Sequence, residues 1–236
     1  MKVKKFNFLF VLGLFVFLSP SIANAEESGK SLTLEKGYET PFEDVILKES
    51  EDEDRVIIKG TKKTDGKTEA YDVTVNTETD TYTVEPKEVT SVKEDALISP
   101  AATTYTGWVK AITDDPVGVD LTRTTLNFSW YDYGSTVGHR SSSLSTWAAN
   151  PSSLGTHWYV SDRWKSSPYL YYSNQKLRVE GTGDYYNYDF LDNDKITEVD
   201  HYIKVDIQND GTYDYVVDWG RRGESTITLD LDVEVN

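Results

Sequence analysis

The stretch of residues 198–235, EVDHYIKVDIQNDGTYDYVVDWGRRGESTITLDLDVEV, decides the fold class of this chain. Its apolar residues alternate with polar ones, most regularly in residues 224–235, as in strands that bury one face. Asp210 and Gly211 separate two alternating runs and predict a tight hairpin turn, because Asp-Gly readily adopts positive φ. The stretch therefore predicts consecutive antiparallel strands.

The same alternation recurs upstream, without a long helical period after residue 25. Strand patterns cover residues 106–112, 121–133, 156–164, 169–179 and 185–190. Strands at such short spacing predict an all-β fold for residues 101–236, an antiparallel β-sandwich or a barrel-like variant of it. Residues 134–155 are rich in Ser, Gly and Asn, and we expect a large surface loop there with one short element.

The first half of the chain has a different composition. Residues 55–60, 68–75 and 79–85 predict a small antiparallel β-meander, preceded by an acidic, sparsely apolar stretch. All six tryptophans and 13 of the 16 tyrosines follow residue 103. We therefore expect an acidic N-terminal segment, residues 26–100, followed by an aromatic-rich β-sandwich domain, residues 101–236.

Residues 1–25 have the features of a secretory signal peptide. Lysines precede the apolar run of residues 6–18, which is shorter than the roughly 20 residues that span a bilayer. Ala23 and Ala25 then supply the small residues of a cleavage site. We expect a secreted, extracellular protein of bacterial type, without a membrane anchor after signal cleavage. A second cut near residue 100, making residues 26–100 a pro-segment, stays an alternative.

The formal net charge is -16, and the absence of cysteine rules out disulfides and a lipid-anchored cysteine. Such an acidic chain repels phosphates, so we expect no nucleic-acid partner. The sequence makes no prediction about the oligomeric state.

The abundance of aromatic residues indicates a binding surface. Doublets such as Trp158-Tyr159 place one ring on each face of a strand, and only one face of a two-layer fold is core. Some rings are therefore exposed, where they can stack on a carbohydrate or a protein partner; the alternative is that they flank the core as cross-strand pairs. The candidate ligand-binding residues are Trp147, Trp158, Trp164, Tyr171 and Tyr186.

Calcium is the one cofactor that the pattern suggests. Oxygen-bearing side chains at alternating positions precede Gly211, as in calcium loops. The candidate ligands are Asp206, Gln208, Asp210 and Asp214. A plain hairpin turn is the alternative, and the position of the bidentate glutamate of an EF-hand is occupied by Val217.

Evidence for catalysis is weaker. His201 lies on the apolar face of its strand, where we expect a hydrogen-bonded core histidine, and His139 has serine neighbours but no nucleophile motif. Asp132, Asp162 and Asp189 lie among aromatic residues and are the first candidates for a glycan hydrolase. The sequence thus favours a secreted, non-catalytic all-β protein that binds a carbohydrate or a protein partner through exposed aromatics. A glycan hydrolase, or an effector released from a pro-segment, is the alternative.

Overall fold

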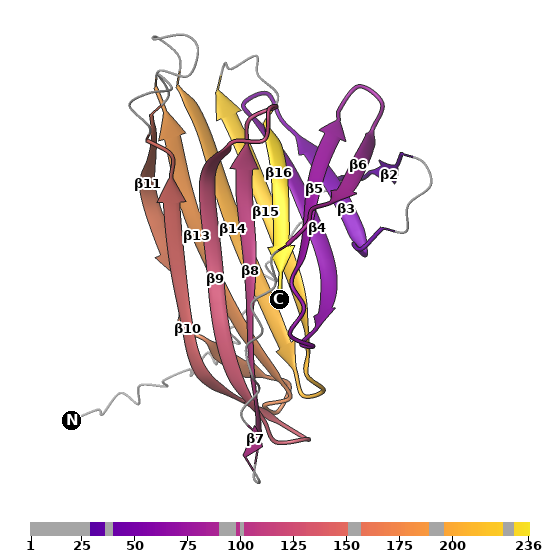
Figure 1. Ribbon diagram of the computed structural model, residues 1–236, viewed down its shortest axis with the longest axis vertical. Coiled ribbons are helices and arrows are strands. Elements are labelled where there is room, and N and C mark those ends of the chain that lie inside the picture. The colour runs from indigo at the N-terminus through magenta and orange to yellow at the C-terminus, as the bar shows by residue number, and fades with distance from the viewer. Residues whose placement is uncertain are drawn as a thin grey trace, which may run out of the picture.

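The chain folds as a β-sandwich, in which two open sheets pack face to face (Figure 1). The computed structural model describes residues 29–35, 40–89, 98–99, 102–150, 157–188, 196–223 and 229–236, and these residues form strands and connections without a helix. The all-β prediction is confirmed as a sandwich, and the barrel-like variant is wrong, because each sheet ends in edge strands. The predicted signal peptide lies outside the described residues and stays a prediction.

Among the described residues, there is no helix with the length and apolar character needed to span a membrane.

Sheet A has the strand order β1-β3-β4-β15-β14-β13-β11, with β12 also paired to β13. Its strands pair antiparallel. Their bounds are β1 Lys30–Ser31, β3 Asp44–Glu49, β4 Glu53–Lys63, β11 Trp158–Lys165, β12 Tyr169–Tyr171, β13 Lys176–Asn187, β14 Thr197–Gln208 and β15 Thr212–Gly223.

Sheet B has the strand order β10-β9-β8-β16-β5-β6-β2, with β7 also paired to β8. The pairing is antiparallel except between β2 and β6. Its strands are β2 Thr33–Leu34, β5 Glu69–Asn76, β6 Thr81–Pro86, β7 Ile98–Ser99, β8 Ala102–Asp114, β9 Asp120–Asp132, β10 Val137–Ala148 and β16 Asp230–Val235.

Strands from the first half of the chain are integral to both sheets. β4 pairs with β15 in sheet A, and β5 pairs with β16 in sheet B. The expected three-stranded meander is therefore only partly correct: β5 and β6 form a hairpin, but β4 crosses to the other sheet. This pairing does not test whether the chain is cut near residue 100, and that division stays a prediction.

The expected surface loop of residues 134–155 is wrong over most of its length. Residues 137–148 form β10, an edge strand paired along β9. The serines gave no apolar alternation, because an edge strand with a solvated outer face needs few apolar residues. β10 is a strand because its backbone hydrogen-bonds along β9, and the sequence pattern of residues 137–148 does not show this pairing.

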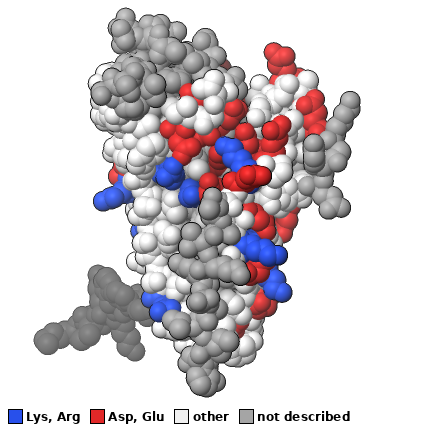
Figure 2. Space-filling model, viewed as in Figure 1, with Lys and Arg blue, Asp and Glu red and all other residues white. Residues whose placement is uncertain are grey.

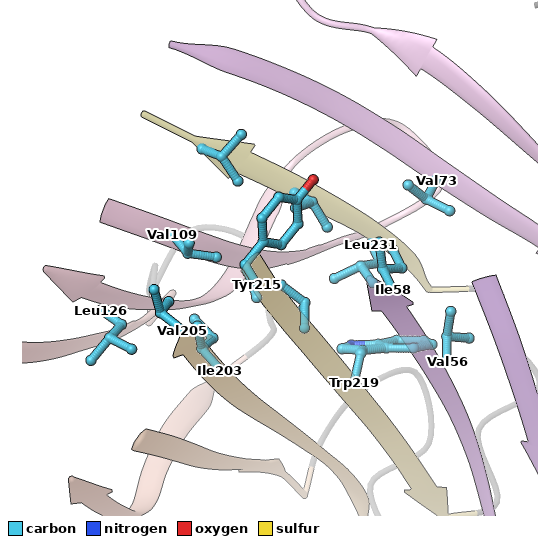
Figure 3. Close-up of a cluster of buried hydrophobic side chains, with 14 of the residues drawn as sticks. Val56, Ile58, Val73, Val109, Leu126, Ile203, Val205, Tyr215, Trp219 and Leu231 are labelled. Atoms are coloured by element: carbon cyan, nitrogen blue, oxygen red, sulfur yellow. The ribbon is translucent and has the colours of Figure 1, made fainter. Parts of the chain in front are cut away.

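The core lies between the sheets, where the period-2 alternation places apolar side chains of both layers. Figure 3 shows Val73 and Leu231 of sheet B beside Val56 and Ile58 of sheet A. The outward-facing residues that remain form two solvent-facing surfaces, one on each sheet, and these surfaces carry the candidate sites.

Candidate functional site

Exposed aromatic rings gather at one edge of sheet A, on the outer face of β11, β12 and β13 and the residues that follow β12 and β13. We call this group of residues the aromatic edge. Trp164 is 51%, Tyr169 44%, Tyr172 71% and Tyr188 47% exposed. The full set of rings is Tyr159, Trp164, Tyr169, Tyr171, Tyr172, Tyr186 and Tyr188.

The strict alternation of β13 produces this surface. Leu177, Val179 and Tyr185 point into the core, so that the alternate residues from Arg178 to Tyr186 face outward. Residues directly opposite on neighbouring strands share a face, and Tyr159 of β11 lies opposite Tyr186. Strand pairing therefore gathers rings that are far apart in sequence.

Three tyrosines at one end of the aromatic edge stack on one another. The ring centroids of Tyr159 and Tyr186 are 5.3 Å apart at an interplanar angle of 22°, and those of Tyr159 and Tyr188 are 5.7 Å apart at 13°. Offset stacking of this kind stabilises aromatic pairs by about 0.5–1.5 kcal/mol. The three rings thus pack against one another, and the hydroxyls of Tyr159 and Tyr188 lie 3.4 Å apart.

Arg178 organises the other end of the aromatic edge. Its guanidinium carbon lies 5.8 Å from the ring centroid of Tyr169 and 5.4 Å from that of Tyr171. The guanidinium also donates to both carboxylate oxygens of Asp206, at 2.6 and 2.7 Å. Burial, with a hydrogen bond to Asp206, raises the pKa of Tyr171. The Tyr171 hydroxyl is therefore held by Asp206, beside Arg178.

A row of three carboxylates crosses the sheet between these two ends. A β-bulge after Val160 turns Asp162 onto the outer face, opposite Asp184, which in turn lies opposite Asp200. Partial burial, together with the carboxylates of Asp200 and Asp162, raises the pKa of Asp184. Trp164 lies one row away on the same face.

The negative charge of Asp200, the third carboxylate of the row, is compensated by two arginines. Arg55 Nη2 lies 2.7 Å from Asp200 Oδ2, and Arg222 Nη2 lies 3.2 Å from Asp200 Oδ1. Gly220 lies opposite Asp200 on the neighbouring strand β15, and a Cβ there would lie 2.5 Å from Asp200 Oδ1. The glycine therefore makes room for this ion cluster above the sheet.

Three of the predicted ligand-binding residues, Trp164, Tyr171 and Tyr186, lie on the aromatic edge. Trp147 is 43% exposed but belongs to β10 in sheet B, with its ring 5.1 Å from the guanidinium of Arg123. The prediction for Trp158 is wrong: it is 1% exposed and packs in the core. The pairing of β11 with β13 sets which ring of the Trp158-Tyr159 doublet faces inward, and the doublet itself carries no such signal.

Sequence reasoning missed Asp184, Tyr159, Tyr169 and Tyr188. The alternation around residue 184 indicates that its side chain faces outward, but its position opposite Asp162 depends on strand order.

The predicted calcium ligands have other hydrogen-bond partners in the structure. Asp206 is bound by Arg178, and both oxygens of Asp214 accept from Gln208 Nε2 at 3.0 Å. In the described part of the chain, no group of three or more His, Cys, Asp or Glu residues is arranged to hold a metal ion.

Asp210 has a turn-forming role instead. Its Oδ1 accepts from the backbone N–H of Thr212 at 3.0 Å and from the Thr212 hydroxyl at 2.6 Å. Gly211 has a φ of 76°, in the left-handed region. β14 and β15 therefore form an antiparallel hairpin through this turn.

The remaining catalytic candidates are dispersed. His201 is fully buried and its Nε2 lies 2.8 Å from Thr113 Oγ1, which confirms the expected core histidine. His139 contacts Ser142 at 3.2 Å on the exposed edge strand β10. Asp132 caps the backbone N–H of Gly134, at 2.7 Å. Asp189 lies outside the described residues.

The chain also has a depression of about 410 Å³ at one end of the sandwich, lined by core residues such as Val56, Val73 and Leu231 and by polar residues such as Asn76 and Arg221. Its wall includes Leu229, which follows residues that the structure does not describe. We therefore assign it no ligand.

No protein-family model, curated protein or solved structure matches this chain.

Proposed function

We propose that this chain is an exported, non-catalytic β-sandwich that binds carbohydrate through the aromatic edge of sheet A. The observation that carries the proposal is the concentration of exposed rings on one rigid sheet edge, Trp164, Tyr169 and Tyr188 among them. When a ligand covers exposed rings, it removes their apolar surface from water, which is favourable.

The chemistry of the aromatic edge suits a sugar. The C–H face of a pyranose is apolar and stacks on a flat ring, whereas its hydroxyls need polar partners. Tyrosine hydroxyls donate and accept, and the carboxylates of Asp162 and Asp184 accept from sugar hydroxyls. A protein partner would also use such rings, but carboxylates left within its buried interface would need compensating cations.

The negative net charge of the chain argues against nucleic acids and other anionic polymers as ligands. Stacking platforms for single-stranded nucleic acids lie in positively charged grooves, and this chain has a net charge of -16. The carboxylate row beside the rings repels anionic polymers in the same way. A neutral or amine-bearing glycan is therefore the ligand class that fits.

The proposal predicts that Trp164→Ala weakens polysaccharide binding by at least ten-fold in affinity electrophoresis, because the ring is 51% exposed at the centre of the aromatic edge. Trp147→Ala is the matched control, since Trp147 is 43% exposed but lies on the other sheet. Equal retardation of Trp164→Ala and the wild-type chain would contradict the proposal.

A second candidate, glycan hydrolysis, is favoured by the Asp162–Asp184 pair. Directly opposite residues on paired strands have Cβ atoms about 4.5–5.5 Å apart, and retaining glycosidases use a close pair in which one carboxyl has a raised pKa. The pKa of Asp184 is raised. Release of reducing sugar that Asp184→Asn abolishes would establish hydrolysis; binding without release would favour the non-catalytic role.

Secretion and processing belong to the same proposal. Intact mass of the protein recovered from culture medium distinguishes a mature start near Glu26 from a start near Thr103. The first outcome retains residues 26–100, and the second identifies them as a pro-segment of a released effector.

A further inference from the structure

The outer face of sheet B carries a depression that is separate from the aromatic edge of sheet A. It has a volume of about 270 Å³ and lies over the middle of β8, β9 and β10. Strand pairing arranges its side chains in two rows across the three strands. The rows are Ser143-Asn127-Trp108 and Ser141-Ser129-Thr106.

All six of these side chains are uncharged. Figure 2 shows the acidic side chains of this face mostly in its upper and right-hand parts, and mostly uncharged surface in the lower left part. Lys110, the next outward residue of β8, is neutralised by Glu234 of β16 and lies over the ring of Trp108, 4.8 Å from its centroid. The two rows therefore present hydroxyls, an amide and one indole, and Asn236 also lines the depression.

Ser129 lines this depression, and its buried hydroxyl is not hydrogen-bonded within the described part of the chain. The residue is 6% exposed, and its Oγ has no hydrogen-bond partner in the described part of the chain. A buried hydroxyl without a partner costs about 1–3 kcal/mol, so such groups are rarely retained without a role. A polar group entering the depression would satisfy it.

We infer that this depression is a second carbohydrate-binding site, specific for an uncharged, hydroxyl-rich glycan and independent of the aromatic edge. Ring stacking on Trp108 supplies the apolar contact. Asn127, Ser141 and Ser143 both donate and accept, which matches the hydroxyls of a neutral sugar and not a carboxylated or sulfated one. Ser129 receives the hydroxyl that reaches deepest.

Because the two sites lie on opposite faces of the sandwich, one molecule can hold two chains of a polysaccharide. Simultaneous engagement raises the apparent affinity for a polymer without a new contact.

The test is affinity electrophoresis of the full chain through gels that contain hydroxyethyl cellulose, dextran or soluble starch, with polygalacturonate as the anionic comparison. Asn127→Ala combined with Ser143→Ala should weaken binding to a neutral polymer at least ten-fold. Ser145→Ala is the matched control, because Ser145 is an exposed serine of the same strand one row outside the depression, and it should change affinity less than two-fold.

Ser129→Ala separates binding from a structural role. The inference expects weaker binding with an unchanged or raised melting temperature, since the variant removes an unpartnered hydroxyl. A lowered melting temperature with unchanged binding overturns it.

The variants distinguish failure of the depression as a site from failure of the aromatic edge as a site. If Trp164→Ala abolishes retardation while the Asn127, Ser143 and Ser129 variants bind as the wild type does, the depression is not a site and the aromatic edge stands. If the reverse holds, the proposed function of the aromatic edge is wrong and the depression is supported. Absence of retardation by every neutral polymer, or equal retardation by polygalacturonate, also overturns the inference.

Discussion

Replacing the buried His201 with Gln should remove a large part of the acid sensitivity of this protein. The ring of His201 is fully buried, with Nε2 2.8 Å from Thr113 Oγ1 and the ring of Tyr185 5.2 Å away between centroids. Burial lowers the pKa of His201 to about 3, from 6.5. Gln retains a polar group near the position of Nε2 but does not titrate.

Proton linkage sets the direction in which the free energy of unfolding changes with pH. Between pH 6.5 and pH 3 the unfolded chain binds a proton at residue 201 that the folded chain excludes, so the folded state loses stability as the pH falls. One pKa unit corresponds to about 1.4 kcal/mol. From pH 7.5 to pH 4.5, the free energy of unfolding should therefore fall by about 2.7 kcal/mol more in the wild type than in His201→Gln.

Urea unfolding followed by tryptophan fluorescence measures this difference at each pH. Comparison with the variant is needed because Asp232 acts in the opposite direction: burial raises its pKa to about 7, so its contribution to stability is present at acid pH and lost as the pH rises to 7. Asp232→Asn should accordingly make stability increase more steeply with pH.

A difference between wild type and His201→Gln that stays constant from pH 7.5 to pH 4.5 would refute the reasoning. It would mean that His201 takes up its proton in the folded state as readily as in the unfolded one.

Three further predictions follow from burial and pairing. Trp158→Ala should lower the free energy of unfolding by about 3–5 kcal/mol in urea titrations, whereas Trp164→Ala should change it by less than about 0.5 kcal/mol; equal losses would contradict the assigned faces. Arg55→Met leaves the carboxylate of Asp218 without its guanidinium and Asp200 with Arg222 alone, and should cost up to about 3 kcal/mol; an unchanged melting temperature would show that the cluster is solvent-screened. Removal of calcium with EDTA should leave the melting temperature unchanged, and a calcium-dependent rise would restore Asp206 as a ligand.

Local pattern predicted most of the regular strands, though not the serine-rich edge strand β10, and it did not predict which strands pair. The alternation in residues 198–235 predicted β14, β15 and the turn between them, because the side-chain period of a strand is a property of consecutive residues. β4 gave the same local signal as β5, and nothing in either segment indicates that they pair in different sheets.

The candidate site could be predicted only as a set of residue types. Trp164, Tyr171 and Tyr186 were candidates because rings on a two-layer fold cannot all be buried. Their convergence on one edge, and the pairing of Asp162 with Asp184, depend on the register between β11 and β13.

The sequence by itself determined the all-β class, the inward and outward faces of the regular strands, the core position of His201 and the acidic character of the chain. The tertiary structure decided which outward residues are neighbours. Arg55 and Asp200 are 145 positions apart and their side chains meet at 2.7 Å, and Trp108, Asn127 and Ser143 form one row across three strands. The physical reason is that alternation follows from the local geometry of the backbone, whereas lateral contacts follow from hydrogen bonding between strands whose separation in sequence no local pattern encodes.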